Sequence, residues 1–142
     1  IICSSAACRT RRDSARRADI LLLFADKRIG MGRELVRGGK PELGVSTVDK
    51  AEQYLQTALE EQEKAKSRGA DTTDVLTRLA KASLKHMEEI DNMTLFAPED
   101  AKPVLNKIAD MPKSVYEKAV HGLNEKGRPI PIPSPLPTPL PE

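Results

Sequence analysis

Histidine has the widest chemical range of any residue in this sequence, and it occurs only twice, at His86 and His121. Ser83 lies one helical turn before His86, and Glu88 and Glu89 lie just after it, which together make the residue set of a hydrolytic triad. A nucleophile and a base on one helical face rarely reach the required geometry, and no oxyanion donors are evident nearby. We therefore interpret His86 as a helix-surface histidine beside a glutamate.

The second histidine has metal-ligand spacing, because His121 lies four residues after Glu117 and four before Glu125. Di-iron bundles need Glu-x-x-His twice with two further carboxylates, whereas the order at His86 is reversed and occurs once. A phosphorelay histidine would be followed by Lys-Gly, which is also missing there. We interpret the three residues around His121 as a solvated ion-pair row. The sequence predicts no catalytic residue, no metal ligand and no cofactor-binding residue.

Other chemical signals are weak. Gly30 and Gly32 follow no predicted strand, so they do not form a phosphate-binding loop. Cys3 and Cys8 have neither a second cysteine pair nor a nearby histidine, which makes them a poor zinc site. Four methionines could form an adaptable binding surface, but their spacing favours core filling: Met31, Met87, Met93 and Met111.

Composition points to one small helical domain. The chain has 142 residues, of which 39% are hydrophobic and only 3% aromatic, so the core must be aliphatic. Residues 1–17 carry a net charge of +4 and the remainder −2. The nearly neutral body gives no electrostatic case for nucleic-acid binding. The basic head could touch phosphates or lipid headgroups, although such runs are usually solvated. No apolar run is long enough to span a membrane.

The first helix is predicted over residues 13–38. It should stop at Gly38 and Gly39, before Pro41, because glycine accepts a left-handed cap and proline cannot continue a helix. Its core stripe is predicted from helical spacing to contain Ile20, Leu21, Leu23, Phe24, Met31 and Leu35.

Three further helical segments follow. Ser46 is predicted to cap a second helix that ends at Gly69, and Asp71 a third that runs to about residue 94. A fourth segment from residue 97 contains Pro103 and Pro112, which should kink or break it. The residues predicted to be buried include Leu55, Leu59, Leu76, Leu79, Leu84 and Ile108.

The predicted fold class is all-α, an antiparallel three-to-four-helix bundle with an extended polyproline C-terminal tail. We divide the chain into a basic, disordered head (1–12), the helical bundle (13–126) and a proline-rich tail or linker (127–142). Proline at every second position favours the stiff polyproline II helix. The tail is predicted to project from the bundle as a spacer; the alternative is a ligand for a polyproline-binding partner.

The sequence resembles an uncharacterised bacterial helical domain family, catalogued as a domain of unknown function. The resemblance rests on residues 13–29, with the phrase Phe-Ala-Asp-Lys-Arg, on residues 46–55 and on residues 82–86, and it covers about residues 13–125. It implies a helical bundle in an exported or envelope-associated protein and no catalytic residues. Pro112 departs from the family, whose members run a continuous helix there, and the head lacks the family's aromatic-rich lead-in.

The functional prediction is a non-catalytic structural or interaction module on a stiff spacer, with an unknown protein or cell-envelope partner and an open oligomeric state. A metal-binding or hydrolytic bundle enzyme is the third alternative. The chain starts at Ile1, which we interpret as an N-terminal truncation. Ser5-Ala6-Ala7-Cys8 would then be a remnant of a secretion-signal or lipoprotein site, although Ser5 replaces the leucine typical of lipoproteins. The residues themselves allow a cytoplasmic location as well.

Overall fold

The computed structural model describes residues 6–127 and 130–131, with side chains from residue 13 onward. Its helices are α1 (Ala6–Arg37), α2 (Pro41–Ser67), α3 (Thr73–Phe96), α4 (Lys102–Ile108) and α5 (Asp110–Glu125), and no strand occurs among the described residues. The all-α prediction is therefore confirmed for this part of the chain. None of these helices is long and apolar enough to cross a membrane.

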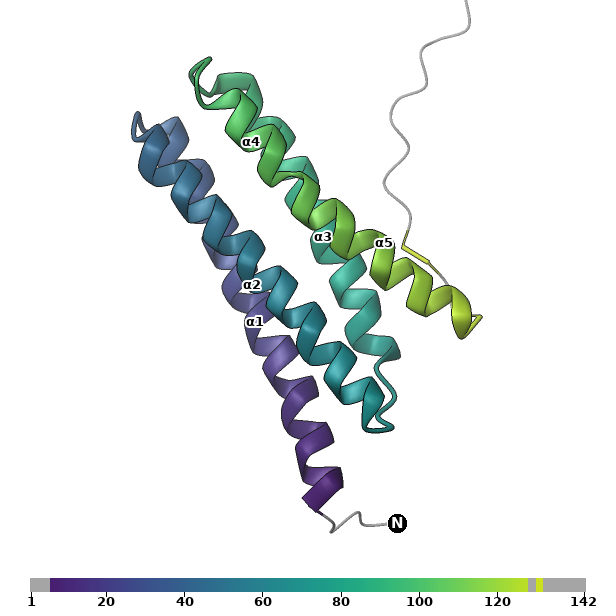
Figure 1. Cartoon of the computed structure of the whole chain (residues 1–142). Helices are drawn as coiled ribbons and strands as arrows, with labels where there is room; N and C mark the ends of the chain where they lie inside the picture. The colour runs from purple at the N-terminus through teal and green to yellow at the C-terminus, as the bar shows by residue number, and fades with distance from the viewer. Residues whose placement is uncertain (1–5, 128–129, 132–142) are drawn as a thin grey trace, which may run out of the picture.

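The helices form two hairpins that pack side by side (Figure 1). One hairpin is α1 with α2, and the other is α3 with the nearly continuous α4 and α5. Helix α1 packs on α2 and α3, while α5 packs on α3 and α2. Within the described residues the backbones of α1 and α5 do not approach each other closely.

Three helix starts differ from the sequence prediction, and one of them is that of α4, which begins at Lys102 and not at residue 97. Helix α1 begins at Ala6, so residues 6–12 are helical rather than part of a disordered head. Helix α2 begins at Pro41 instead of Ser46, because the fixed φ of proline suits the first turn of a helix and its missing N–H is not needed there. The predicted stop is confirmed: α1 ends at Arg37 and Gly39 has a φ of 84°.

The predicted break in the last helix occurs at Ala109, between the two prolines. Pro103 lies in the first turn of α4, where a missing N–H costs little. Pro112 cannot donate a hydrogen bond to the carbonyl of Ile108, four residues earlier, so the helical ladder is interrupted there. The second proline thus separates α4 from α5.

Glycines allow α1 and α2 to approach closely. A Cβ added at Gly32 would lie 2.5 Å from Cγ2 of Val48, and one added at Gly44 would lie 2.5 Å from Cγ2 of Val36. The one at Gly44 would also lie 2.9 Å from the backbone nitrogen of Val36. Any larger residue would force the two helices apart.

The apolar core consists of two clusters, one at each end of the bundle. The first cluster comprises Ala18, Leu22, Ala25, Leu55, Ala58, Leu59, Val75, Leu76, Leu79, Ala80, Val115, Ala119 and Leu123. The second cluster comprises Ile29, Val36, Val48, Ala51, Ile90, Met93, Ala97, Ala101, Leu105 and Ile108. Five of the six residues singled out from the sequence are buried, whereas Leu84 is only half-buried.

The predicted core stripe of α1 is wrong for four of its six residues, whereas Leu21 and Leu35 are partly buried. Ile20, Leu23, Phe24 and Met31 are 43%, 60%, 46% and 56% exposed, and we call these four residues the outer face of α1. The helix instead buries Ala18, Leu22, Ala25, Ile29 and Val36. Both sides of α1 are apolar, and the side with small residues faces the core because it allows the tight contact with α2.

The beginning of the proline-rich tail contacts the bundle. Ile130 packs against the first cluster, and the Tyr116 hydroxyl donates a hydrogen bond to the Pro131 carbonyl at 2.8 Å. The prediction that residues 128–142 all project freely is therefore wrong for these two residues; the rest of that prediction lies outside the described residues.

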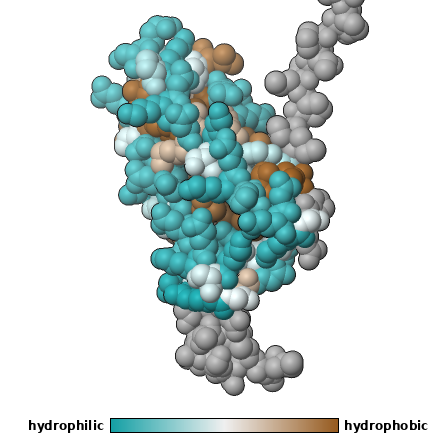
Figure 2. All heavy atoms as spheres, turned by 45° about the vertical axis from the view of Figure 1, so that its right-hand side comes forward, coloured by the Kyte–Doolittle hydropathy of each residue, from teal (hydrophilic) through white to brown (hydrophobic). Residues whose placement is uncertain are grey.

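Hydrophilic residues cover most of the face shown in Figure 2, with hydrophobic residues in separate patches.

Candidate functional site

A histidine inside the bundle is hydrogen-bonded to two carboxylates, one on each side of its ring. His86 and Glu52 are both fully buried, and His86 Nδ1 lies 2.7 Å from Glu52 Oε1. On the other side of the ring, His86 Nε2 lies 2.9 Å from Oδ1 of Asp26, which is partly exposed. The interpretation of His86 as a helix-surface histidine is therefore wrong. Its position on α3 belongs to the core side of the helix, between Ser83 and Ile90.

Three helices supply one residue each to this site: α1 carries Asp26, α2 carries Glu52 and α3 carries His86. Each of the three lies between a residue of the first cluster and one of the second cluster on its own helix. The polar residues therefore form a layer that separates the two apolar clusters. The break between Ile108 and Val115 on the last helix falls at the same level.

The hydrogen-bond geometry fixes the number of protons in this layer. A neutral imidazole carries one N–H, whereas two nitrogens each facing a carboxylate oxygen need two bridging protons. Either His86 is an imidazolium between two carboxylates, or His86 is neutral and Glu52 carries the second proton. Both arrangements have a net charge of −1, so the layer behaves as a single coupled acid.

Burial and hydrogen bonding act on these groups in opposite directions. Burial lowers the pKa of His86, but the hydrogen bonds and charges of Asp26 and Glu52 outweigh it and raise that pKa to about 9. Burial raises the pKa of Glu52, and His86 only partly opposes this shift. Glu52 Oε2 is buried and has no hydrogen-bond partner among the described residues. The second proton of the layer is thus retained at neutral pH.

The residues considered for a catalytic triad are not brought together. The hydroxyl of Ser83 donates to the carbonyl of Leu79 at 2.7 Å instead of to His86. Glu89 accepts two hydrogen bonds from Arg33, at 2.9 and 3.1 Å, and Glu88 is exposed. Both ring nitrogens of His86 are engaged by carboxylates, so this histidine has no free position from which to accept a substrate proton.

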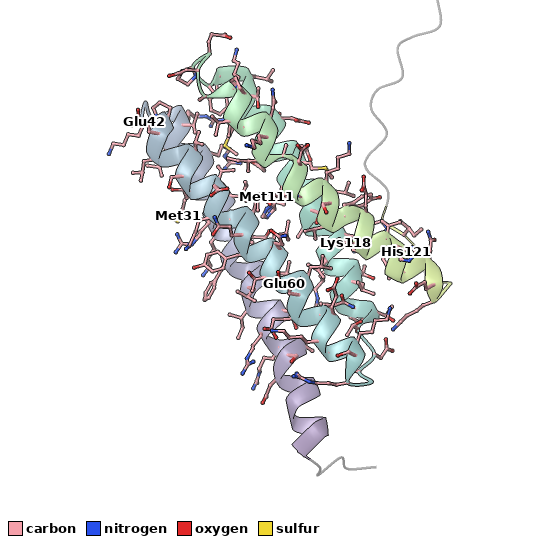
Figure 3. The ribbon with its side chains drawn as sticks, viewed as in Figure 1. Met31, Glu42, Glu60, Met111, Lys118 and His121 are labelled. Carbon is pink, nitrogen blue, oxygen red and sulfur yellow. The ribbon has the colours of Figure 1, made fainter. Side chains whose placement is uncertain are left out.

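The second histidine is a surface residue. His121 Nε2 lies 3.1 Å from Glu125 Oε1, and the Lys66 ammonium donates to the other oxygen of Glu125 at 3.1 Å. The hydrogen bond and charge of Lys66 lower the pKa of Glu125. Figure 3 shows His121 and Lys118 on α5. Both residues and Glu117 line an open depression of about 440 Å³. In the part of the chain with described side chains, no three His, Cys, Asp or Glu residues are arranged to hold a metal ion.

Asp26 and Glu52 were not identified from the sequence as partners of His86. A signal was present, since Glu52 directly follows Ala51 and lies three residues before Leu55, on the core stripe of its helix. A charged residue in a core register needs a buried partner. His86 occupies the matching register on α3, three residues after buried Ser83. Pairing the two would have required knowing which helices adjoin, which periodicity alone does not reveal.

Comparison of the chain with protein-family models, curated proteins and solved structures found no match.

Proposed function

We propose that this chain is a non-catalytic helical domain of a bacterial envelope-associated protein, which acts as an interaction module on a proline-rich tether. The observation that carries the proposal is the outer face of α1. It leaves four large apolar side chains about half exposed on the side of α1 opposite its buried stripe, although the Phe24 ring packs edge-on against Tyr54. Large apolar side chains gathered on one exposed side of a helix are typical of a surface that another molecule covers.

The polar layer supports the non-catalytic part of the proposal. Catalytic acids and bases need a position open to substrate, and His86 is closed on both sides by Glu52 and Asp26. The layer instead separates two apolar clusters, where it favours one alignment of three helices over others. Buried polar groups are best known for such a role in fixing register.

The tether is supported by the start of the tail and its sequence. Ile130 and Pro131 hold the chain against α5, so the tail begins at a defined place on the bundle. The alternating prolines that follow favour an extended polyproline II conformation. The envelope location is supported by the family resemblance of residues 13–125 alone.

The non-catalytic part is tested by assaying the purified chain and a His86→Gln variant with a panel of ester, amide and phosphoester substrates, and by titrating divalent metals in a calorimeter. We expect no turnover above buffer and no stoichiometric metal binding. Turnover that disappears in His86→Gln, or a tight one-to-one metal complex, would overturn the proposal.

A further inference from the structure

The outer face of α1 combines apolar side chains with cations, which lie beside the apolar residues and, at Lys27, between them; we call these cations its basic border. From Ile20 to Met31 the exposed apolar residues extend along the helix for about 17 Å, at about 1.5 Å per residue. At about 100° per residue, four basic residues lie on the same side of the helix as this stripe. They are Arg16, Arg17, Lys27 and Arg28. Figure 3 shows Met31 on the outer side of the α1–α2 hairpin, away from α5.

The acidic side chains of α1 do not balance these cations. Asp19 pairs with Arg78 at 2.8 Å, Glu34 pairs with Arg33 at 3.3 Å, and Asp26 faces His86. Among the described residues, Arg16, Arg17 and Lys27 form no ion pair, and Arg28 lies over the Tyr54 ring at 5.2 Å. Asp13 is the one exposed carboxylate near the stripe with no ion pair to another described side chain. The face therefore carries a net positive charge next to its apolar side chains.

The charge and the apolar side chains of this face favour a lipid surface over a second copy of the chain. Peptide and protein partners bind best through side chains that fill pockets. Two surface depressions on the described part of the chain are lined by residues of α2, α3 and α5, and α1 contributes to neither. A second copy of the chain would place two like-charged borders together, which is unfavourable. A helix with an apolar face and a basic border is the usual form of an interfacial membrane-binding helix.

We propose that the outer face of α1 binds the surface of an anionic lipid bilayer, with the helix parallel to the membrane plane. Ile20, Leu23, Phe24 and Met31 would enter the boundary between headgroups and acyl chains. The basic border would contact lipid phosphates and carboxylates. This inference rests on the proposed function, since it names the partner of the surface that carries that proposal.

The test is cosedimentation of the full chain with phosphatidylcholine vesicles made with and without phosphatidylserine, at low and high salt. We expect binding to the anionic vesicles only, and weaker binding at high salt. Arg16→Gln/Arg17→Gln/Lys27→Gln should lower the affinity about 100-fold, at about fivefold per basic residue. Lys107→Gln/Lys113→Gln/Lys118→Gln removes the same charge from exposed sites on α4 and α5 and should bind nearly as well as the parent chain.

The apolar contribution is tested in the same assay with Leu23→Ser/Met31→Ser, which should lower the affinity at least tenfold. Leu95→Ser is the matched control, because Leu95 is 81% exposed at the end of α3. No binding, equal binding to neutral vesicles, or equal losses in control and test variants would overturn the lipid inference. A dimer in sedimentation velocity that Leu23→Ser/Met31→Ser abolishes, without vesicle binding, would overturn it while leaving the interaction module intact. Catalytic turnover in the substrate panel would instead overturn the proposal that the domain is a non-catalytic interaction module.

Discussion

At the scale of single residues, the polar layer is the feature most sensitive to change. Its three members are joined by the two hydrogen bonds of His86, so the cost of burying them depends on all being present. Removing one member of a buried pair leaves a charge without compensation, whereas removing both members leaves an apolar site that neighbouring side chains can fill. Single and double substitutions in the layer should therefore have very different effects.

His86→Leu should lower the free energy of unfolding by about 3–5 kcal/mol, because Glu52 then loses its only hydrogen-bond partner among the described residues. Glu52→Leu/His86→Leu removes both groups and should return the stability to within about 1 kcal/mol of the parent chain or above it. The measurement is urea unfolding followed by circular dichroism. Lys85→Leu, at an exposed neighbouring position, controls for helix propensity. A double variant as unstable as the single one would contradict this account.

The same layer makes stability depend on pH. The pKa of His86 is raised from 6.5 in the unfolded chain to about 9 in the folded chain, so its contribution is complete below pH 6.5 and is lost as the pH rises through 9. The raised pKa of Glu52 acts in the same direction, but from a lower pH. The free energy of unfolding should fall by about 3 kcal/mol between pH 6.5 and 9.5.

This fall is measured by urea unfolding at a series of pH values, with Glu52→Leu/His86→Leu as the control. The control should show a much flatter profile over the same interval, because it lacks both coupled groups. Identical profiles for the two proteins would show that the layer does not hold the second proton.

At the scale of the helices, the contact between α1 and α2 is set by glycine. Gly44→Ala should lower stability by about 1–3 kcal/mol, because its Cβ would meet both the side chain and the backbone of Val36. Gly30→Ala is the matched control: it lies in α1 with no atom within 4 Å of the added Cβ, so it should raise stability by up to about 1 kcal/mol. Thermal unfolding of the two variants measures the difference. Equal changes in stability for the two variants would mean that α1 and α2 do not approach each other closely at Gly44.

The start of the tail is a second element with its own stability. A chain ending at Pro131 should unfold like the parent, whereas a chain ending at Gly127 should lose the packing of Ile130 and the Tyr116 hydrogen bond. Tyr116→Phe in the full chain should cost about 0.5–1.5 kcal/mol. Differential scanning calorimetry of the two truncated chains, Tyr116→Phe and the parent chain separates these effects. No difference between the two truncations would show that the tail does not pack on the bundle.

At the scale of the whole molecule, the sequence predicted what local chemistry decides and missed what packing decides. Gly38, Gly39 and Pro112 mark the end of α1 and the break before α5, because backbone restrictions act on them directly. The burial of Leu79 follows from helical spacing within α3. The side of α1 that is buried and the partners of His86 depend on which helices adjoin. Because α1 is apolar on two sides, helical periodicity alone allows either side to face the core.

The choice between these two sides of α1 decides whether the chain has an exposed apolar face at all, and adjacent leucines test it. Leu22 is 6% exposed in the first cluster, and Leu23 is 60% exposed on the outer face. Urea unfolding should show a loss of about 2–5 kcal/mol for Leu22→Ala and less than about 0.5 kcal/mol for Leu23→Ala. A large loss for Leu23→Ala with little for Leu22→Ala would contradict the account, because the proposed binding face would then be part of the core.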